Sequence, residues 1–348
     1  MPVNDAQELS VVVPVYNGAH TLGPCLHALL NASGPSPEII VIDDGSTDNS
    51  AEIARRAGAR VIEQETNLGQ GSARNAGVKL ARGNIVVFVD ADVVIHADAL
   101  ERIGQFFREQ PDYAAVFGSY DTVPAVRTLV SQYRNLLHHF VHQQGDREAE
   151  TFWTGLGAVR REAFEAVGGF ADNYTPIEDV NLGLRMHDAG YRIALEPQVM
   201  GTHLKDWTLR SMIATDIFDR ALPWARMAFL RGEMTSQLNT SYRQRIAVAC
   251  TVLGFVCLAA SLLLPWLLLP ASVLFAAVII LNAALFRFFI EQRSLGFAAV
   301  AAPLQIIHYL SGSAGFALGC LEVVSGRAIT IKSRQSQSSP ARRLHKKA

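Results

Sequence analysis

The sequence predicts an α/β fold: a mostly parallel open sheet with helices on both faces, followed by helices that enter a membrane. Two observations support this prediction. Short β-branched apolar runs alternate with amphipathic segments over the first hundred residues, and this alternation is typical of a parallel sheet covered by helices. Residues 246–286 then contain no Asp, Glu, Lys or Arg, which is expected of a segment that lies in lipid.

The first apolar run, residues 9–15, is short and rich in valine, so it predicts a buried strand. The turn Tyr16-Asn-Gly18 follows it and leads into an amphipathic segment that ends near Leu30. The same pattern recurs along the chain. Further strands are expected at 38–43, 60–63 and 84–90, and helices at 70–81 and from a cap at Ser46 or Thr47 to about Ala57.

Polar side chains follow three of these strands at the point where each strand ends. The carboxyl ends of parallel strands meet at one edge of a sheet, where ligands bind in open α/β folds. The first strand supplies Pro14, Tyr16 and Asn17, the second supplies Asp43 and Asp44, and the fourth supplies Asp90 and Asp92. Carboxylates crowded in this way require a cation or hydrogen-bond donors to offset their charge.

Asp90 and Asp92 are two residues apart, so their side chains point the same way if the strand geometry continues. Two carboxylates with open coordination positions suit Mg²⁺ or Mn²⁺, completed by diphosphate oxygens and water. The alternative is that Asp92 only caps the following helix.

Five motifs together resemble those of family 2 glycosyltransferases, which have the Rossmann-like GT-A fold. They occur in the family's order and span residues 9–205. The motifs are Val11-Val-Val-Pro-Val-Tyr-Asn17, Val41-Ile-Asp-Asp-Gly-Ser-Thr-Asp48, Asn67-Leu-Gly-Gln-Gly-Ser-Ala-Arg-Asn-Ala-Gly77, Val89-Asp-Ala-Asp92 and Glu178-Asp179.

The resemblance implies a nucleotide-sugar donor and a role for each matching residue. The donor's nucleoside pocket would be lined by Pro14, Tyr16, Asp43, Asp44 and Arg74, with Asp90 also contacting the donor. Asp179, beside Glu178, would be the catalytic base that takes the proton of the acceptor hydroxyl, and a single displacement of this kind inverts the anomeric centre.

Three further sites are weighed against plainer alternatives. Trp153, in the segment with Gly155 that resembles the family's acceptor side, either stacks on a sugar or belongs to the core. His203 is a third metal ligand or diphosphate contact, or an ordinary hydrogen-bonding histidine. His138 and His142 have the spacing of a zinc pair, but an amphipathic helix that carries histidines is favoured.

The expected organisation is a cytosolic GT-A domain over residues 1–240, a membrane region over 246–320 and a basic, disordered tail over 327–348. An amphipathic segment at about 205–230, with Trp207 and Trp224, is expected to lie on the bilayer surface. Spans are expected at 246–264 and 270–289. The segment 296–320 either spans as a third helix or packs as a re-entrant or interfacial segment.

The sequence therefore predicts an inverting, metal-dependent enzyme of the cytoplasmic membrane that moves one sugar to a membrane-associated, lipid acceptor. The net charge of −1 does not favour nucleic acid as a partner. One alternative is a processive polysaccharide synthase, which the absence of a Q-x-x-R-W motif disfavours, since Asp219-Arg220-Ala-Leu-Pro-Trp224 does not match it. The other is a membrane-tethered nucleotide-sugar binding protein without catalysis.

Overall fold

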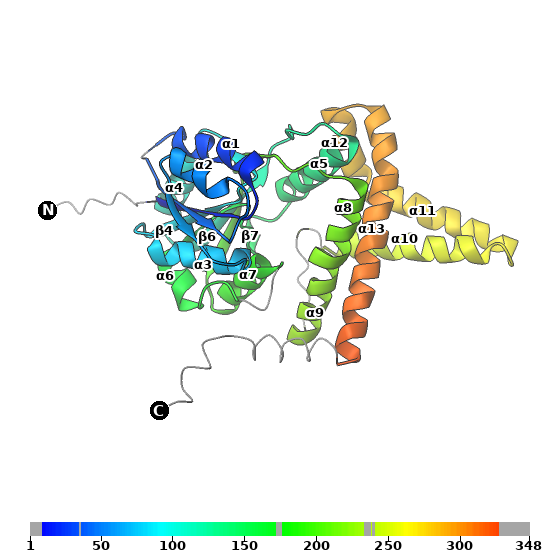
Figure 1. Ribbon diagram of the computed structural model, residues 1–348. Helices are drawn as coiled ribbons and strands as arrows, with labels where there is room; N and C mark the ends of the chain where they lie inside the picture. Colours follow the sequence, from blue (N-terminus) through cyan, green and yellow to red (C-terminus); the bar gives the residue numbers. More distant parts are fainter. Residues whose placement is uncertain (1–8, 35, 172–175, 233–237, 239–240, 327–348) are drawn as a thin grey trace.

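The structure is a computed structural model that describes residues 9–34, 36–171, 176–232, 238 and 241–326 (Figure 1). Residues 9–203 form a domain on one nine-stranded sheet, here called the sheet domain. The described residues between 209 and 324 are mainly helical and lie beside it. The predicted α/β sheet followed by apolar helices is confirmed. The basic tail at 327–348 lies outside the described residues.

The first half of the sheet domain is parallel, with strand order β3-β2-β1-β4. Its strands are β1 (Leu9–Val15), β2 (Glu38–Asp43), β3 (Arg60–Glu63) and β4 (Ile85–Val89). Its helices are α1 (Ala19–Leu30), α2 (Ser50–Arg56) and α3 (Gln70–Leu80). Every residue of β4 is buried, as expected of a strand covered on both faces, which explains its continuous apolar sequence.

Helix α2 begins at Ser50, later than the cap expected at Ser46 or Thr47. The side chains that precede it are used by the loop between β1 and α1. The hydroxyl of Ser46 accepts the backbone N–H of Asn17 at 2.9 Å, and Asp48 accepts that of Ala19 at 3.0 Å. These bonds hold two loops together at the carboxyl edge of the sheet.

The second half adds mixed pairing to the sheet, giving the full order β3-β2-β1-β4-β8-β6-β9-β5 with β7 on β9. Its strands are β5 (Val93–Ile95), β6 (Tyr113–Tyr120), β7 (Glu148–Ala149), β8 (Leu156–Arg160) and β9 (Arg192–His203). Its helices are α4 (Ala99–Glu109), α5 (Leu129–Gln143), α6 (Arg161–Ala166) and α7 (Glu178–Asp188).

Strand β8 lies antiparallel between β4 and β6, with Leu156 paired to Val89. Because its direction is reversed, the amino end of β8 meets the carboxyl end of β4. The segment before β8, with Trp153 and Gly155, is thereby placed beside Asp90. Strands β6 and β9 run parallel to each other and end at this same edge, so residues from the ends of β4, β6 and β9 and from the start of β8 converge there.

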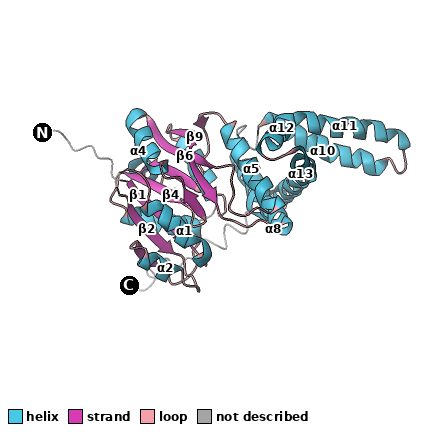
Figure 2. Cartoon of the chain, turned by 90° about the horizontal axis from the view of Figure 1, so that it is seen from above, coloured by secondary structure: helices cyan, strands magenta, loops and turns pink. Residues whose placement is uncertain are grey.

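Helices cover both faces of the sheet (Figure 2). One apolar cluster joins β1 and β4 to α1 and α4 through residues such as Leu26 and Phe107. The other joins the opposite face to α3, α6 and α7 through residues such as Phe164 and Leu182. The sheet is thus packed between two apolar layers.

The C-terminal helices begin with α8 (Leu209–Ala214), the π-helix η2 (Thr215–Ala221) and α9 (Leu222–Arg231). They continue with α10 (Tyr242–Ala260), the short 3-10 helix η4 (Pro265–Leu267), α11 (Leu268–Leu281), α12 (Ala283–Gln292) and α13 (Leu295–Val324). Helix α13 runs alongside α8 and α9, whereas α10 and α11 form a hairpin that projects away from the sheet domain (Figure 1).

Among the described residues, α10 and α13 are each long and apolar enough to cross a membrane, judged by length and composition. The second expected span, 270–289, is broken: α11 and α12 meet at Asn282 with a bend of 55°. The Asn282 side chain donates to Val278 and accepts the Tyr309 hydroxyl at 2.8 Å. This polar side chain, which hydropathy alone does not single out, marks the break.

Candidate active site

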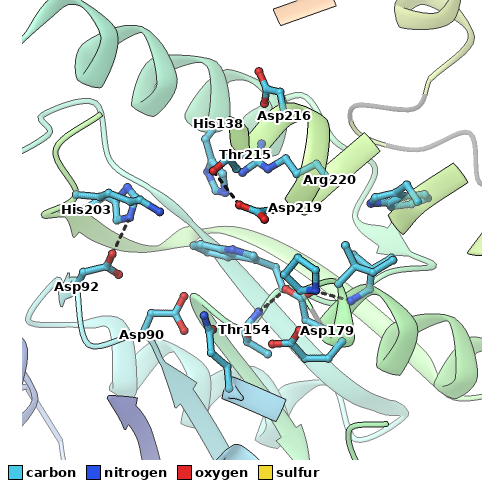
Figure 3. Close-up of a pocket in the computed structure, with 18 of the residues that line it drawn as sticks. Asp90, Asp92, His138, Thr154, Asp179, His203, Thr215, Asp216, Asp219 and Arg220 are labelled. Carbon is cyan, nitrogen blue, oxygen red and sulfur yellow. Dashed lines mark hydrogen bonds and ion pairs between the residues drawn. The ribbon is translucent and has the colours of Figure 1, made fainter. Parts of the chain in front are cut away.

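A cleft of about 1410 Å³ opens at the carboxyl edge of the sheet. Figure 3 shows Asp90, Asp92 and Asp179 on one wall, and Asp219 and Arg220 of η2 facing them. The cleft extends from Pro14 and Tyr16 to α10 and α13. One continuous space therefore connects the sheet domain to the apolar helices.

Asp90 and Asp92 both line this cleft, with side chains 29% and 31% exposed. One Asp90 oxygen, Oδ1, accepts from the Arg74 guanidinium at 2.7 Å. Oδ2 of Asp92 lies 3.4 Å from Nε2 of His203. Burial opposes ionisation of Asp92, but the hydrogen bond and charge of His203, with the charge of Lys205, outweigh it and hold the pKa of Asp92 below its ordinary value.

These residues fit a divalent cation only in part. No three His, Cys, Asp or Glu side chains in the described ranges are grouped closely enough to hold a metal by themselves. Asp90 and Asp92 nevertheless supply two hard, partly open carboxylates, and Mg²⁺ and Mn²⁺ commonly complete such sites with phosphate oxygens and water. The arrangement suits a metal that arrives with a phosphorylated ligand.

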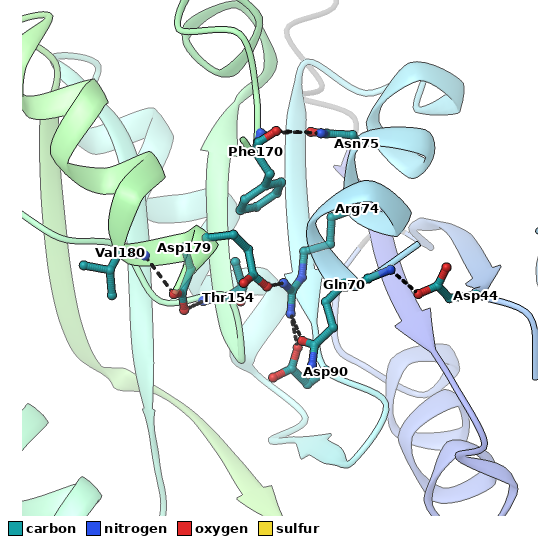
Figure 4. A network of polar contacts seen from close by, with 11 residues as sticks. Asp44, Gln70, Arg74, Asn75, Asp90, Thr154, Phe170, Asp179 and Val180 are labelled. Atoms are coloured by element: carbon teal, nitrogen blue, oxygen red, sulfur yellow. Dashed lines mark hydrogen bonds and ion pairs between the residues drawn. The ribbon is translucent and has the colours of Figure 1, made fainter. Parts of the chain in front are cut away.

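Arg74 is at the centre of the polar network in Figure 4. Its side chain is 1% exposed and donates to Asp90, to Glu178 at 2.8 Å and to Gln70 at 2.9 Å. Glu178 is buried by this pair, and its second oxygen, Oε2, has no hydrogen-bond partner among the described residues. The sequence predicts Arg74 to bind the donor and Glu178 to belong to the catalytic pair. In the structure, their ion pair connects the acidic residues along the wall of the cleft.

Asp179 follows Glu178 in the first turn of α7 and lines the cleft. Its carboxylate accepts the N–H of Val180 at 2.7 Å and of Thr154 at 3.5 Å. Burial first, and then the charge of Glu178, raises the pKa of Asp179 to about 7 against the opposing effect of Arg74. A carboxylate with this pKa can accept a proton near neutral pH.

At the other end of the cleft lie Pro14 and Tyr16, and Tyr16 is 52% exposed. Asp44 also lines the cleft, and its oxygens accept the N–H groups of Leu68 and Gly69, each at 2.8 Å. Asp43 is buried, accepts the N–H of Ser46 at 2.7 Å and is not among the lining residues. Of the predicted acidic pair, only Asp44 reaches the cleft.

Aromatic rings form the base of the cleft. Trp153 packs on Tyr120 and His138, with ring centroids 4.9 and 4.7 Å away, and Tyr120 stacks on His203 at 4.3 Å. A side chain at Gly155 would meet the Trp153 ring at 2.2 Å, so this glycine makes room for the indole. Trp153 is therefore both a core residue and a cleft residue.

His138 and His142, which have the spacing of a zinc pair, lie among the aromatic rings at the base of the cleft. His138 and His142 pack ring against ring at 3.9 Å, and His142 Nδ1 lies 2.9 Å from the Gly118 carbonyl oxygen. Burial, followed by the charge of His142, lowers the pKa of His138 well below its ordinary value. A neutral imidazole at His138 therefore faces the cleft.

The charged residues of η2 were not among the site residues predicted from the sequence. Arg220 is open to the cleft and makes no hydrogen bond or ion pair within the described part of the chain. The surrounding protein, and then the charge of Arg134, lowers its pKa to about 10. The sequence signal for Arg220 was the segment Asp219-Arg220-Ala-Leu-Pro-Trp224, which does not match the Q-x-x-R-W motif of processive polysaccharide synthases.

A cleft with paired carboxylates, a buried aspartate and an open arginine at the carboxyl edge of an α/β sheet is the kind of site that binds a phosphorylated ligand. Comparison with known proteins identifies a family for part of the chain. The family model "Glycosyl transferase family 2" matches residues 10–168. Residues 10–168 therefore carry a glycosyl transferase family 2 domain.

Curated relatives support the assignment. Glycosyltransferase AglE of Haloferax volcanii is 29% identical over 203 residues, covering 56% of this chain and 66% of that protein. Glycosyltransferase GlyG of Streptococcus pneumoniae is 37% identical over 117 residues, covering 32% and 38%. Poly-beta-1,6-N-acetyl-D-glucosamine synthase of Staphylococcus epidermidis is 26% identical over 230 residues, covering 63% and 54%. The matches thus span about two fifths to two thirds of these relatives' lengths.

Among solved structures, a mannosyltransferase from Pyrobaculum calidifontis, in complex with GDP-Man and Mn²⁺, has the same fold. Its TM-score is 0.55 at 21% identity, with 91% of this chain and 90% of that chain covered. The likeness extends over the C-terminal helices as well as the sheet domain.

Proposed function

We propose that this enzyme transfers one sugar from a nucleoside-diphosphate sugar to a hydroxyl group of a membrane-associated acceptor, with inversion at the anomeric carbon. The observation that carries the proposal is the position of Asp179, a carboxylate with a pKa of about 7, in the same cleft as Asp90 and Asp92. Base and leaving-group site are thus provided by one cavity.

In the proposed step, Asp179 takes the proton of the acceptor hydroxyl as that oxygen bonds to the anomeric carbon. The bond from that carbon to the diphosphate oxygen breaks at the same time, and the nucleoside diphosphate leaves with the electron pair. Attack from the face opposite the leaving group inverts the centre. The two N–H groups that reach Asp179 orient its carboxylate for this proton transfer.

The donor diphosphate would lie beside Asp90 and Asp92. A bound Mg²⁺ or Mn²⁺ would act there as a Lewis acid on the leaving diphosphate. His203 contacts Asp92 and is a candidate third ligand or a group that orients Asp92. GDP-Man and Mn²⁺ in the solved mannosyltransferase are ligands of the same kind.

Arg220 would bind a phosphate oxygen from the opposite wall. Its guanidinium has no protein partner within the described ranges, so an anionic group would satisfy it without breaking an existing contact. The nucleoside would extend from there toward Tyr16, Pro14 and Asp44. This direction leaves the end of the cleft near α10 and α13 for the acceptor.

The acceptor end is bounded by Trp153 and by apolar residues of the C-terminal helices, among them Val248, Phe316 and Ala317. Trp153 offers a ring for a sugar or another flat group, and the apolar residues suit a hydrocarbon chain. These contacts support a lipid-bearing acceptor. Arg243 and Arg245 at the start of α10, and Arg287 in α12, support a cytosolic position for the sheet domain.

The test is to incubate purified enzyme with Mn²⁺, a panel of labelled nucleotide sugars and a membrane lipid extract, and to analyse the product. We expect one labelled sugar per acceptor, with inverted configuration by NMR. A ladder of products would favour the polymer synthesis performed by the Staphylococcus relative. Donor binding without turnover for any acceptor would favour a binding protein and would contradict the proposal.

A further inference from the structure

We infer that the α10–α11 hairpin alone enters the bilayer, and that α13 lies along the bilayer surface on the side of the sheet domain. This inference rests on the membrane attachment proposed above. Helix α13 satisfies the length and composition of a span, so its contacts must decide its position.

Both ends of α13 are bonded to elements on the sheet-domain side of the proposed bilayer. Next to its first turn, Arg293 donates to Gln132 at 2.6 Å and to the Thr122 carbonyl at 2.7 Å. Near its last turn, Glu322 accepts from Arg226 of α9 at 2.6 Å. At 1.5 Å per residue these ends are about 43 Å apart, which exceeds the ~30 Å hydrocarbon core. If α13 crossed the bilayer, the residues bonded to one of its ends would have to lie on the opposite side from the sheet domain.

Its middle is tied in the same way. Gln305 accepts the Tyr133 hydroxyl of α5 at 2.8 Å. Nδ1 of His308 lies 2.7 Å from Asp216 of η2, which also accepts from Arg134 at 2.9 Å. The start, the middle and the end of α13 therefore all contact polar groups of the sheet domain or of helices packed on it.

Glycines bring α13 into direct contact with η2 and α9. A Cβ at Gly315 would come within 2.6 Å of the Ile217 carbonyl oxygen, and one at Gly319 within 2.6 Å of that of Leu222. Helix α9 is in turn bonded to α7, because Arg231 donates to Asp188 at 2.8 Å. The layer of α8, η2, α9 and α13 is thus attached along its length to the sheet domain.

The opposite face of α13 is apolar and exposed. Glu322 is the one Asp, Glu, Lys or Arg in α13, and it points to Arg226. Exposed large apolar residues run along this face: Leu295, Val300, Leu318, Leu321 and Val324. Helix α13 thus presents its polar groups and glycines to α5, η2 and α9. Its apolar face points away from them and would be shielded from water by lipid if the helix lies along the bilayer surface.

The hairpin has the opposite character. Helices α10 and α11 lie side by side and run crosswise to α13, away from the sheet domain, in both Figure 1 and Figure 2. Helix α10, with 19 residues, is about 28 Å long at 1.5 Å per residue, close to the thickness of the hydrocarbon core. The tip exposes Leu262, Leu263, Trp266 and Leu269 by 87%, 86%, 67% and 73%.

An apolar tip of this kind would be unfavourable in water, and it indicates that the turn stays within the bilayer. Arginines flank the hairpin on both sides in the sequence: Arg243 and Arg245 are in the first turn of α10, and Arg287 is in α12, the helix that follows α11. The hairpin therefore enters from the sheet-domain side and returns to it. The cleft, which is lined by Arg245, Val248 and Phe316, then opens at the bilayer surface.

The experiment measures which positions a membrane-impermeant maleimide reaches in sealed vesicles. In a chain whose four native cysteines are replaced by alanine, single cysteines are introduced as Lys79→Cys, Gln292→Cys, Trp266→Cys and Ser325→Cys. Lys79 is exposed on α3 and reports the side of the sheet domain. Gln292 and Ser325 are exposed and flank α13, and Trp266 is at the hairpin tip.

We expect Gln292→Cys and Ser325→Cys to react from the same side as Lys79→Cys, and Trp266→Cys to react from neither side until detergent is added. Reaction of Ser325→Cys only from the opposite side would show that α13 crosses. Reaction of Trp266→Cys from the opposite side would show that the hairpin crosses completely.

A second measurement needs no cysteine replacement. A protease site inserted after Gly326 of the otherwise native chain is expected to be cut from the sheet-domain side of intact vesicles. Protection there, with cleavage only from the opposite side, would overturn the inference. Vesicle flotation separates the two claims: a protein that does not float with lipid contradicts membrane attachment itself, whereas a floating protein with the opposite labelling contradicts only the topology.

Discussion

Arg74 and Glu178 are 104 residues apart in the sequence, yet their side chains form an ion pair of 2.8 Å that is almost completely buried in the wall of the cleft. Arg74 also bonds Asp90, so this pair connects the first turn of α7 to the end of β4. Because Asp179 is the next residue after Glu178, the pair determines where its carboxylate lies.

Glu178→Gln is expected to lower the free energy of unfolding by about 3 kcal/mol, because it breaks a buried ion pair and leaves the Arg74 charge with Asp90 as its one remaining acidic partner. Urea unfolding measures the change. The matched control is Glu63→Gln, which removes an exposed ion pair with Arg55 and should cost less than about 1 kcal/mol. Equal costs for the two variants would show that the buried pair has no special role.

The rate of transfer should fall as the pH is lowered through about 7, because Asp179 must be ionised to accept a proton and burial raises its pKa to about 7. The measurement is kcat/KM against pH with a donor present at low concentration. A profile that stays flat from pH 8 to pH 5 would exclude Asp179 as the base.

The same shift has a consequence for stability. The raised pKa favours the protonated carboxyl in the folded chain, so its stabilising contribution is complete below the unfolded value near 4 and is lost as the pH rises toward 7. Asp179→Asn should therefore be more stable than wild type at pH 8, with the difference shrinking at pH 4. Thermal unfolding at both pH values measures this, and a less stable variant at pH 8 would contradict the assigned pKa direction.

Asp92→Asn should raise the Mn²⁺ concentration needed for half-maximal rate by at least about tenfold, because one of the two proposed carboxylate ligands is lost. Asp92 is preferred to Asp90 because Asp90 also pairs with Arg74. Asp98→Asn serves as the control, because that carboxylate is exposed and pairs with Arg102 on α4. An unchanged Mn²⁺ requirement would remove Asp92 from the metal site.

Arg220→Gln should raise the KM for the donor about tenfold, corresponding to roughly 1.4 kcal/mol, because the charged contact to phosphate is lost. Arg210→Gln on α8 is the matched control, as Arg210 is exposed and does not line the cleft. If only the KM of the acceptor rises, Arg220 contacts the acceptor instead of the donor diphosphate.

Much of the sheet could be predicted because its strands are short apolar runs whose burial is a local property of the sequence. The strand bounds of β1, β2 and β3 agree with the expected 9–15, 38–43 and 60–63. The position of β8 could not be predicted in this way. Its antiparallel insertion between β4 and β6 depends on contacts between distant segments, and it is this insertion that brings Trp153 to Asp90.

Site residues could be predicted where a sequence motif fixes their position. They were harder to predict where a hydrogen bond to another part of the protein determines which way the side chain points. Asp90, Asp92 and Asp179 all reach the cleft, but Asp43 is used by the N–H of Ser46 and stays outside it. Arg220 could not be found by motif, because its exposure to the cleft depends on how η2 packs against α13.

The central claim is that Asp179 accepts the proton of the acceptor hydroxyl. It is tested most directly by the single-turnover rate of Asp179→Asn, measured beside its donor affinity and beside Asp188→Asn, an exposed aspartate of the same helix. The account predicts a loss of about 10²- to 10⁴-fold in rate with donor affinity unchanged within threefold, and wild-type behaviour for Asp188→Asn. A rate for Asp179→Asn within a few fold of wild type would contradict it.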